Sequence, residues 1–250
     1  MDEKEDKKEN RKEFDKYQKK WNVDNVEIDR FNWQTKNPVI VEKEKSLNMI
    51  IKERKGTMLE VGCGEGANSI TLNIPKQYTG CDYSNTRIEF AKKHGKGRFV
   101  VSDGTKLIFR NNSFDTVFCR DVIHHVGDRQ RLLSEMYRVC KKNGSVILVE
   151  SNAYNPVNIG FSLLFKKEHD MRKITPGYVK RLMSKFHGDL DIGFSEAYNL
   201  DRLFFHYKMG FSGLAKFSIF RIANDVVNFV FETFQPSIFS AYMLVELKKK

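Results

Sequence analysis

The sequence has few cysteines and prolines, and it has no long uninterrupted apolar run. Its 250 residues contain four cysteines and five prolines. The cysteines are Cys63, Cys81, Cys119 and Cys140. None of them forms a C-x-x-C pair, so we expect reduced packing residues rather than a disulfide or a zinc site. The first residues are a run of mixed charges without an apolar stretch, and we therefore expect no signal peptide.

Metal-ligand spacing and clustered positive charge are missing as well. Four histidines lie far apart in the chain: His94, His169, His187 and His206. Their spacing is not typical of metal ligands, and we predict no metal site. The net charge is +11, but the basic excess is +6 in residues 1–150 and +5 in residues 151–250. Because this charge is spread out, nucleic acid is not favoured, although a basic balance favours some anionic partner.

The most informative pattern present is an apolar strand that runs into three alternating glycines. Met58-Leu59-Glu60-Val61 is followed by Gly62, Gly64 and Gly66. Glycine accepts positive φ and has no Cβ, so such a turn lets backbone N–H groups approach a negatively charged group. We predict a nucleotide-like cofactor at this strand end. Gly62, Gly64 and Ala67 also satisfy the relaxed dinucleotide pattern, so the glycines alone do not identify the cofactor.

Two acidic residues follow at the ends of the next two predicted strands. Asp82 lies 20 residues after Gly62, where an acid can accept hydrogen bonds from both hydroxyls of a ribose. Asp103 follows Phe99-Val100-Val101-Ser102 and is placed to meet an adenine amino group. A carboxylate only accepts hydrogen bonds, so it suits a diol and an amine and repels a 2′-phosphate.

With these motifs in this order, the chain resembles the class I S-adenosylmethionine-dependent methyltransferases. Residues 114–126 resemble the fourth strand of that family and its following loop, and residues 137–150 resemble its next helix, turn and fifth strand. The resemblance covers about residues 56–151. Lys142 and Asn143 depart from it, because the family more often has Pro-Gly there. The resemblance implies a Rossmann-like α/β fold, with a doubly wound, mostly parallel seven-stranded sheet, helices on both faces and an antiparallel last strand.

The same resemblance implies a cofactor site for S-adenosylmethionine. Its expected residues are Glu60, Gly62, Gly64, Gly66, Asp82, Tyr83, Asp103, Gly104, Cys119 and Arg120. The three glycines would let the backbone approach the methionine part, and Glu60 would orient this turn and the amino group. Asp82 would hold the ribose, while Tyr83, Asp103 and the Gly104 N–H would meet the adenine. Cys119 and Arg120 would border the transferable methyl group.

Two adjacent histidines are the candidates for a catalytic base. His124 and His125 follow the fourth strand, and an imidazole can take a proton from an acceptor at neutral pH. Adjacent residues cannot both face the site. We favour His125, because the resembling family often has histidine there, and a structural role for either residue stays open.

We divide the chain into three segments of one α/β domain. Residues 1–37 would form a charged helix followed by an irregular stretch. Phe14, Tyr17 and Trp21 on that helix would either close over the cofactor or merely dock the segment. Residues 38–151 would form the cofactor-binding core, starting with a helix from Pro38 to Arg54. Residues 152–250 would form an acceptor-side insertion and the last strands, including one at 241–247.

Specific caps are expected within the core. Ser84 is placed to cap a helix that ends at His94, and Asp128 is placed to cap a helix that ends at Asn143-Gly144.

The last hundred residues are rich in phenylalanine. They hold 13 of the 20 phenylalanines. In a helix over residues 217–234, Arg221 and Asp225 interrupt any run close to the ~20 apolar residues needed to span a bilayer. This helix is open to three interpretations: a core helix, a cover of the acceptor site, or a helix on a membrane surface. The region loosely resembles methyltransferases that act near glycan or lipid pathways.

These observations predict a cytoplasmic S-adenosylmethionine-dependent methyltransferase acting on a small-molecule or lipid- or glycan-linked acceptor. In one version of this hypothesis, the enzyme also makes a peripheral membrane contact through residues 200–242. The alternatives are an RNA or protein methyltransferase, an aminopropyl transferase, a nicotinamide-dependent oxidoreductase and a non-catalytic membrane-associated binding protein. The sequence leaves the acceptor and the oligomeric state open.

Overall fold

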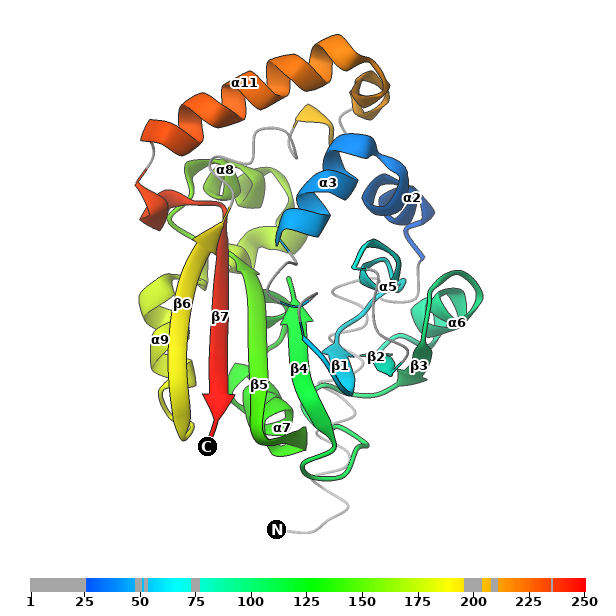
Figure 1. Ribbon diagram of the computed structural model, residues 1–250, viewed down its shortest axis with the longest axis vertical. Coiled ribbons are helices and arrows are strands. Elements are labelled where there is room, and N and C mark those ends of the chain that lie inside the picture. Colours follow the sequence, from blue (N-terminus) through cyan, green and yellow to red (C-terminus); the bar gives the residue numbers. More distant parts are fainter. Residues whose placement is uncertain are drawn as a thin grey trace.

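A single seven-stranded sheet runs through the middle of the molecule in the computed structural model (Figure 1). The structure describes residues 26–47, 51, 54–72, 77–195, 204–207, 211–234 and 236–250. The strands are β1 (Met58–Val61), β2 (Tyr78–Asp82), β3 (Arg98–Val101), β4 (Phe114–Arg120), β5 (Cys140–Ser151), β6 (Gly188–Ser195) and β7 (Tyr242–Lys249). Their order is β3-β2-β1-β4-β5-β7-β6.

The sheet confirms the expected fold class. Strands β1 to β5 pair in parallel, and β7 is antiparallel to both β5 and β6. The strand order reverses at β1, which lies between β2 and β4. In open α/β sheets, ligands bind beyond the carboxyl ends of the strands at such a reversal. The glycine turn that follows β1 therefore lies where a ligand site is expected.

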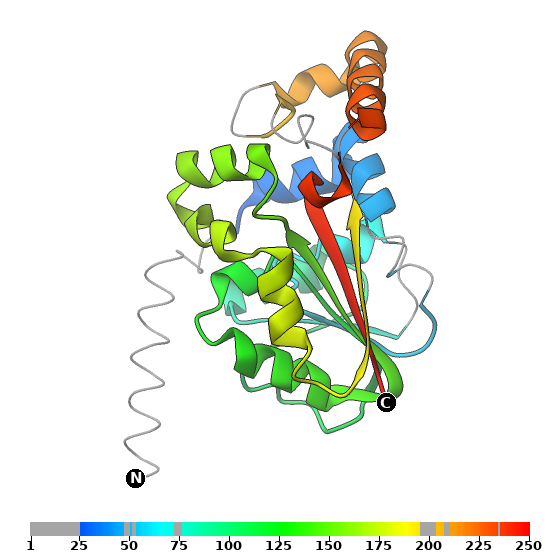
Figure 2. The same cartoon turned by 90° about the vertical axis from the view of Figure 1, so that its left-hand side faces the viewer.

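Helices cover both faces of the sheet (Figures 1 and 2). The α-helices are α2 (Ile28–Lys36), α3 (Pro38–Leu47), α5 (Asn68–Thr71), α6 (Asn85–His94), α7 (Arg129–Val139), α8 (Pro156–Leu164), α9 (Pro176–Met183) and α11 (Ser218–Phe234). The 3₁₀ segments are η1 (Ile123–His125), η2 (Lys166–Lys173), η3 (Ser212–Lys216) and η4 (Ser237–Phe239).

The core consists of two main layers, one on each face of the sheet. Val117 and Cys119 of β4 pack with α7 and α9, whereas Phe118 packs in the opposite layer with Ile88 of α6. This division follows from the strand geometry, because successive side chains point to opposite faces. Since β4 is a central strand covered on both faces, its apolar run is continuous rather than alternating.

Both predicted helix caps are confirmed. The Ser84 hydroxyl accepts a hydrogen bond from the Arg87 N–H at 3.3 Å, and the Asp128 carboxylate accepts one from the Arg131 N–H at 2.9 Å. The predicted end of the second helix was wrong. Helix α7 ends at Val139, because the next residue is buried and already pairs with β4 as the first residue of β5.

The prediction of an irregular stretch up to residue 37 was also wrong, because α2 occupies residues 28–36. Its Phe31 is buried and meets the Phe90 ring of α6 edge-on at 5.0 Å. This tertiary contact stabilises a short helix whose sequence is too polar to indicate one. Helix α3 begins at Pro38 as expected, and it is described as far as Leu47, before the gap at residues 48–50. The predicted helix of residues 1–21 lies outside the described residues.

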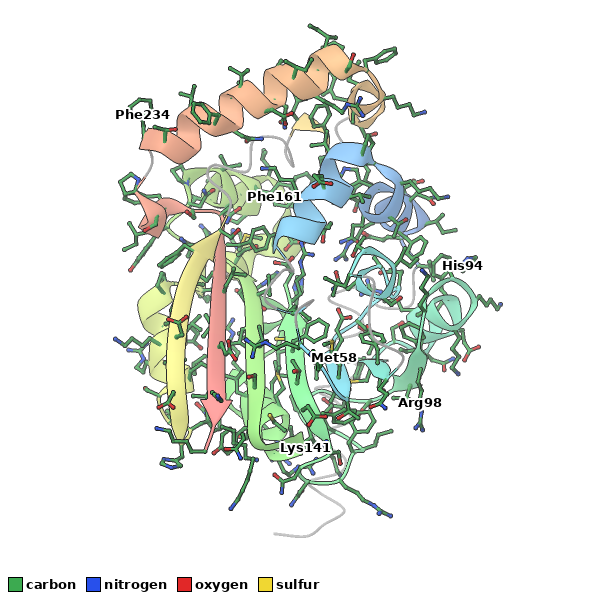
Figure 3. All side chains as sticks on the ribbon, viewed as in Figure 1. Met58, His94, Arg98, Lys141, Phe161 and Phe234 are labelled. Carbon is green, nitrogen blue, oxygen red and sulfur yellow. The ribbon has the colours of Figure 1, made fainter. Side chains whose placement is uncertain are left out.

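Helix α11 lies at the end of the molecule opposite the C-terminus (Figure 1). Figure 3 shows Phe161 of α8 and Phe234 of α11 toward this end, and Lys141 near the start of β5 toward the other. The carboxyl ends of the parallel strands therefore face the α8 and α11 side. Within the part of the chain that the structure describes, no helix combines the length and apolar character needed to cross a membrane.

Candidate active site

The glycine turn after β1 has the backbone conformation that the sequence predicts. Gly62 has φ of 77° and Gly64 has φ of 52°, both in the left-handed region that favours glycine. A Cβ on Gly62 would lie 2.5 Å from Cγ2 of Val122, so the β1 turn and the loop after β4 approach closely only because this Cβ is absent. A Cβ on Gly64 would meet no atom within 4 Å. The turn thus packs tightly at Gly62 and borders open space at Gly64.

The N–H groups of this turn are used inside the protein. The Gly62 and Cys63 N–H groups both donate to the Cys81 carbonyl, at 2.8 and 3.0 Å, and the Gly64 N–H donates to Oδ2 of Asp82 at 2.9 Å. The sequence had suggested that these donors face an anionic ligand group. At Gly64 the N–H binds the Asp82 carboxylate and not a ligand. The turn therefore provides room for a ligand but few free N–H donors.

Asp82 is held firmly beside the turn. Its Oδ1 accepts a hydrogen bond from the Ser84 N–H at 2.9 Å, and the residue is 8% exposed. Burial raises the pKa of this carboxyl, while Arg87 and the two N–H donors act against that rise. Each carboxylate oxygen can accept a second hydrogen bond. The fixed carboxylate can therefore receive the two hydroxyls of a diol.

Glu60 lies inside the sheet and is fully engaged with neighbouring side chains. Its Oε1 accepts a hydrogen bond from the Asn68 amide at 2.6 Å, and its Oε2 accepts a short one from the Tyr78 hydroxyl. Burial raises the pKa of Glu60 to about 7, against the lowering effect of both bonds. Glu60 thus fastens the start of α5 to β2 and orients the segment after the glycine turn.

The residues predicted for adenine follow the carboxyl ends of β2 and β3. Tyr83 is half-buried directly after β2. Asp103 is exposed, and its Oδ1 accepts bonds from both the N–H and the hydroxyl of Thr105, each at 2.8 Å. A Cβ on Gly104 would lie 2.7 Å from Leu132 of α7, so this loop packs closely on that helix. The topology brings all three residues to the same edge as Asp82.

Cys119 and Arg120 lie at the end of β4, where the structure turns them to opposite faces. Cys119 is 0% exposed in the core layer beneath α7, and burial raises the pKa of its thiol well above the usual range. The Arg120 guanidinium is buried against both carboxylate oxygens of Glu44 in α3, one of them at 2.9 Å. The thiol therefore offers no surface to a ligand, and Arg120 ties α3 to the sheet.

The two candidate histidines occupy different environments. His124 is buried, with Nδ1 3.0 Å from Oε2 of Glu150 and Nε2 3.2 Å from Oε2 of Glu168. Burial alone would lower its pKa, but the two carboxylates raise it to about 10. The His125 side chain is 28% exposed, and its Nε2 lies 4.0 Å from Oε2 of Glu168. With both ring nitrogens beside carboxylates, His124 is a poor base, and His125 is the more accessible imidazole.

Sequence reasoning missed Glu150 and Glu168. Oε1 of Glu150 accepts hydrogen bonds from the N–H groups of Val122 and Ile123, at 2.8 and 2.7 Å, so this carboxylate shapes the histidine turn η1. A charged residue at the end of the apolar run of β5 was the available signal for Glu150. Glu168 lies in η2, 44 residues from His124, and no local pattern connects the two.

A layer formed by α2 and residues 204–207 lies against the glycine turn. Glu65 of the turn accepts a hydrogen bond from the Glu27 N–H at 3.3 Å, and Oε2 of Glu27 accepts one from the Tyr207 hydroxyl at 2.9 Å. The Trp33 indole N–H donates to the Phe205 carbonyl at 2.6 Å. Sequence reasoning did not predict this layer, because its two parts are about 170 residues apart.

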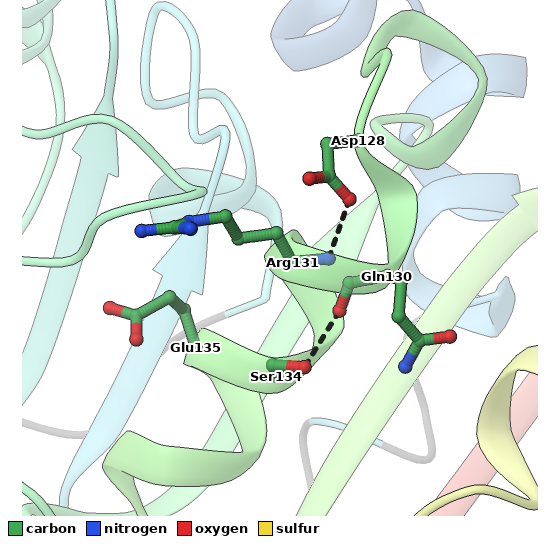
Figure 4. Close-up of a pocket in the computed structure, with 5 residues that line it drawn as sticks. All are labelled: Asp128, Gln130, Arg131, Ser134 and Glu135. Atoms are coloured by element: carbon green, nitrogen blue, oxygen red, sulfur yellow. Dashed lines mark hydrogen bonds between the residues drawn. The ribbon is translucent and has the colours of Figure 1, made fainter. Parts of the chain in front are cut away.

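A surface hollow of about 390 Å³ lies along the first turns of α7 (Figure 4), where the Arg131 guanidinium donates to the Thr105 carbonyl at 3.1 Å. Its lining comes from one stretch of the chain: Asp128, Gln130, Arg131, Ser134 and Glu135. The Ser134 hydroxyl donates to the Gln130 carbonyl at 2.9 Å, which is a bond within helix α7. None of the five is a predicted site residue, and we do not assign the hollow to the active site.

Taken with the fold, the strand-end residues suit a ligand that carries a diol. Asp82 presents a fixed carboxylate to the diol, and open space at Gly64 adjoins it. Arg87 lies 3.4 Å from Oε1 of Glu65 and also acts on the Asp82 carboxyl, so the charges of both acids are offset inside the protein.

Comparison with known proteins agrees with this chemistry. Residues 59–148 match the family model for a methyltransferase domain. Over 138 residues the chain is 30% identical to phosphoethanolamine N-methyltransferase 2 of Caenorhabditis elegans, covering 50% of this chain and 32% of that protein. Over 94 residues it is 34% identical to demethylmenaquinone methyltransferase of Thermotoga maritima, covering 37% and 41%. The chain thus spans less than half the length of these relatives.

The fold has close counterparts among solved structures. A SAM-dependent methyltransferase of Thermotoga maritima, described as a possible histamine N-methyltransferase, superposes with a TM-score of 0.63 at 19% identity. The superposition covers 92% of this chain and 100% of that one. Residues 59–148 thus match a methyltransferase domain, and the chain as a whole has the fold of a SAM-dependent methyltransferase.

Proposed function

We propose that this chain binds S-adenosylmethionine at the carboxyl edge of β1, β2 and β3 and methylates a small-molecule acceptor. The observation that carries the proposal is the Asp82 carboxylate, which Gly64 and Ser84 fix next to open space. When bound, the cofactor supplies an electrophilic methyl group on a sulfonium with a neutral leaving group. The protein then mainly has to align the acceptor and exclude water.

Different parts of the site would hold different parts of the cofactor. We assign the ribose to Asp82, the adenine to Tyr83, Asp103 and the Gly104 N–H, and the methionine part to the space beside Gly64. Glu60 would not contact the cofactor itself. It would position the segment after the glycine turn through its hydrogen bonds to Asn68 and Tyr78. Cys119 and Arg120 contribute through the backbone at the end of β4, because their side chains face the core and Glu44.

His125 is the residue that we propose to contact the acceptor. It is the more exposed of the two histidines, and it follows β4 directly at the cofactor edge. Relatives named for phosphoethanolamine and demethylmenaquinone support a small-molecule acceptor, but these two compounds share no reacting group. The identity of the acceptor is therefore the main question that an experiment has to answer.

The test is methyl transfer from labelled S-adenosylmethionine to metabolite and lipid extracts, followed by mass spectrometry. We expect a labelled product with the full chain, and much less of it with Asp82→Ala when the cofactor concentration is limiting. Calorimetric titration should show that the wild type binds S-adenosylmethionine, and a flat titration would refute the proposal. Labelling of added RNA or protein instead would favour those alternatives, and saturable NADH binding without S-adenosylmethionine binding would favour an oxidoreductase. An aminopropyl transferase would bind the decarboxylated cofactor instead.

A membrane-surface contact through α11 is our second proposal, and it refines where the enzyme works. The helix presents a stripe of apolar side chains to solvent: Ile219 at 67% exposure, Ile222 at 59%, Val226 at 58% and Phe229 at 71%. Asn224 and Asn228 are its less exposed residues. Arg221 and Asp225 are exposed as well, and Phe220 is 38% exposed, so the described part of the helix is exposed nearly all round and buries little of its apolar surface.

The neighbourhood of the stripe favours a lipid surface as its partner. Leu163 and Leu164 of α8 and Ile238 and Phe239 of η4 are also exposed, and Lys216 just before α11 is exposed with Arg221 within it. Apolar side chains beside exposed cations are typical of helices that lie in the interface of anionic bilayers. Helix α11 lies at the end of the molecule toward which the parallel strands point (Figure 1). A lipid-linked acceptor would have to enter the proposed site from this end.

Flotation with anionic vesicles tests the membrane contact. The wild type should float with vesicles of phosphatidylglycerol and phosphatidylcholine, and the double variant Ile222→Asp, Phe229→Asp should stay at the bottom of the gradient. Ile108→Asp is the matched control, because Ile108 is 67% exposed in the loop after β3. A wild type that stays at the bottom, or a double variant that floats equally well, would refute the contact.

A further inference from the structure

The histidine turn and η2 bring three metal-ligating side chains together. One donor atom from each of His124, His125 and Glu168 lies within 4.8 Å of the other two. Both histidines belong to η1 at the end of β4, and Glu168 comes from η2 after α8. The tertiary structure assembles this cluster, because Glu168 is 44 residues away from His124 in the sequence.

Two of the three separations can be compared with those around a shared ion. Zinc bonds to histidine nitrogen or carboxylate oxygen are about 2.1 Å long, so two ligand atoms on one tetrahedral ion lie ~3.4 Å apart. Oε2 of Glu168 lies 3.2 Å from Nε2 of His124 and 4.0 Å from Nε2 of His125. The first distance is close to the tetrahedral value, and a small shift of the partly exposed His125 side chain would bring the second to it.

Glu150 supplies the support that a metal-bound histidine normally has. Its Oε2 lies 3.0 Å from Nδ1 of His124, and its Oε1 is fixed by the N–H groups of Val122 and Ile123. Metal-ligating histidines almost always donate their other N–H to such a carboxylate, which sets the tautomer and the ring orientation. With Nδ1 as the donor to Glu150, a bound ion would replace the proton on Nε2, the nitrogen that lies 3.2 Å from Oε2 of Glu168.

The cluster is closed on one side and open on the other. The His124 side chain is 1% exposed, whereas those of His125 and Glu168 are 28% and 26% exposed. An ion can therefore enter from solvent, and the described residues supply three ligands, which leaves one position of a tetrahedral ion for a further ligand. Sites with three protein ligands and one open position are typical of catalytic rather than structural zinc.

We propose that His124, His125 and Glu168 bind a divalent transition-metal ion of the zinc type. Two imidazoles and one carboxylate suit zinc and its neighbours, whereas magnesium prefers a set of oxygen ligands. Ion binding itself does not depend on the function proposed above. Its role does rest on that function: the open position would take the oxygen or nitrogen of the acceptor, which is how His125 would contact it.

The experiment measures zinc binding to the full chain after treatment with a chelator and dialysis. Competition with a colorimetric zinc indicator should give one Zn²⁺ per chain, and Mg²⁺ should not compete. His125→Ala and Glu168→Gln should each weaken zinc binding at least about 10-fold, because each removes one of only three protein ligands. His169→Ala is the matched control and should leave the affinity unchanged, since His169 is exposed next to Glu168 and contacts Arg172.

Two further measurements separate the outcomes. Co²⁺ in place of Zn²⁺ should give an intense visible absorption band in the wild type and in His169→Ala, and not in His125→Ala. S-adenosylmethionine titration of every variant reports folding and the cofactor site independently, so loss of zinc with retained cofactor binding supports the metal site. No stoichiometric zinc in a wild type that binds S-adenosylmethionine overturns the metal site alone, and equal zinc binding by His125→Ala and His169→Ala overturns it as well.

Discussion

The carboxyl edge of the sheet and helix α11 are organised in opposite ways. At the edge, charged groups such as Asp82 and Arg120 are buried and each has a partner fixed by the fold. On α11, apolar side chains are exposed, and Asn224 and Asn228 are the less exposed ones. A geometry that is set before anything binds is what a defined ligand requires, and this agrees with the cofactor site that we propose at the edge. An exposed apolar area is what a surface contact requires, and this agrees with the membrane contact that we propose for α11.

Breaking the Arg120 to Glu44 pair should have the largest effect on the edge. Removal of one partner leaves an uncompensated buried charge, so Arg120→Ala should lower the free energy of unfolding by about 3 to 5 kcal/mol. Urea denaturation followed by circular dichroism measures this. The double variant Arg120→Met, Glu44→Leu should recover most of the loss. A single variant as stable as the wild type would show that α3 does not depend on this pair.

The second-largest expected effect is a dependence of the free energy of unfolding on pH, caused by Glu60. Its pKa is about 7 in the folded protein against 4.5 as the reference value, so the folded state holds an extra proton between these pH values. Stability contributed by this group is then present below about pH 4.5 and is lost as the pH rises through 7, by about 2 to 3 kcal/mol. Glu60→Gln should flatten this slope in denaturation curves between pH 5 and 7. An unchanged slope would contradict the assignment.

Asp82→Ala should affect binding more than stability. Loss of both acceptors for a ribose diol, each a charge-assisted hydrogen bond, should weaken S-adenosylmethionine about 30-fold, or about 2 kcal/mol. Calorimetry measures the affinity. Asp191→Ala on β6 is the control, since Asp191 lies on the edge strand away from the cofactor edge, and it should bind like the wild type. An Asp82→Ala protein with unchanged affinity would remove the ribose assignment.

A charge introduced on α11 should change the free energy of unfolding least of all these substitutions. A small change here would contrast with the large loss expected for Arg120→Ala at the carboxyl edge. Phe229→Asp changes a side chain that is 71% exposed, so the free energy of unfolding should change by less than about 0.5 kcal/mol. Thermal denaturation without vesicles measures this. A loss of several kcal/mol would mean that the stripe packs against another part of the protein. Helix α11 would then be a packed element like the carboxyl edge of the sheet, and the contrast between them would fail.

The sequence predicted the local parts of the site well. The positive φ of Gly62 and Gly64, the caps by Ser84 and Asp128, and the position of Asp82 beside the turn all follow from short motifs with local causes. The seven-stranded sheet with its antiparallel last strand followed from the resemblance to the methyltransferase family. Prediction failed at α2, whose short polar sequence becomes helical through the packing of Phe31 on Phe90.

Side-chain direction and distant contacts were beyond local reasoning. Cys119 and Arg120 are adjacent, so the pleat of β4 necessarily sends them to opposite faces, but the sequence does not say which face is covered by which helix. The covering elements decide that the thiol lies in the core and that Arg120 meets Glu44. For the same reason, the stripe of α11 was compatible with a core helix until its surroundings were known.

By itself, the sequence determined the part of the edge that we assign to the methyl donor. A glycine turn and acids at successive strand ends are short patterns, and their geometry follows from backbone conformation and strand parallelism. The tertiary structure alone decided the part that we assign to the acceptor. It placed Glu150 and Glu168 on His124 and turned the apolar face of α11 outward. These arrangements arise from contacts between residues tens of positions apart, and packing of whole elements, rather than local spacing, selects such contacts.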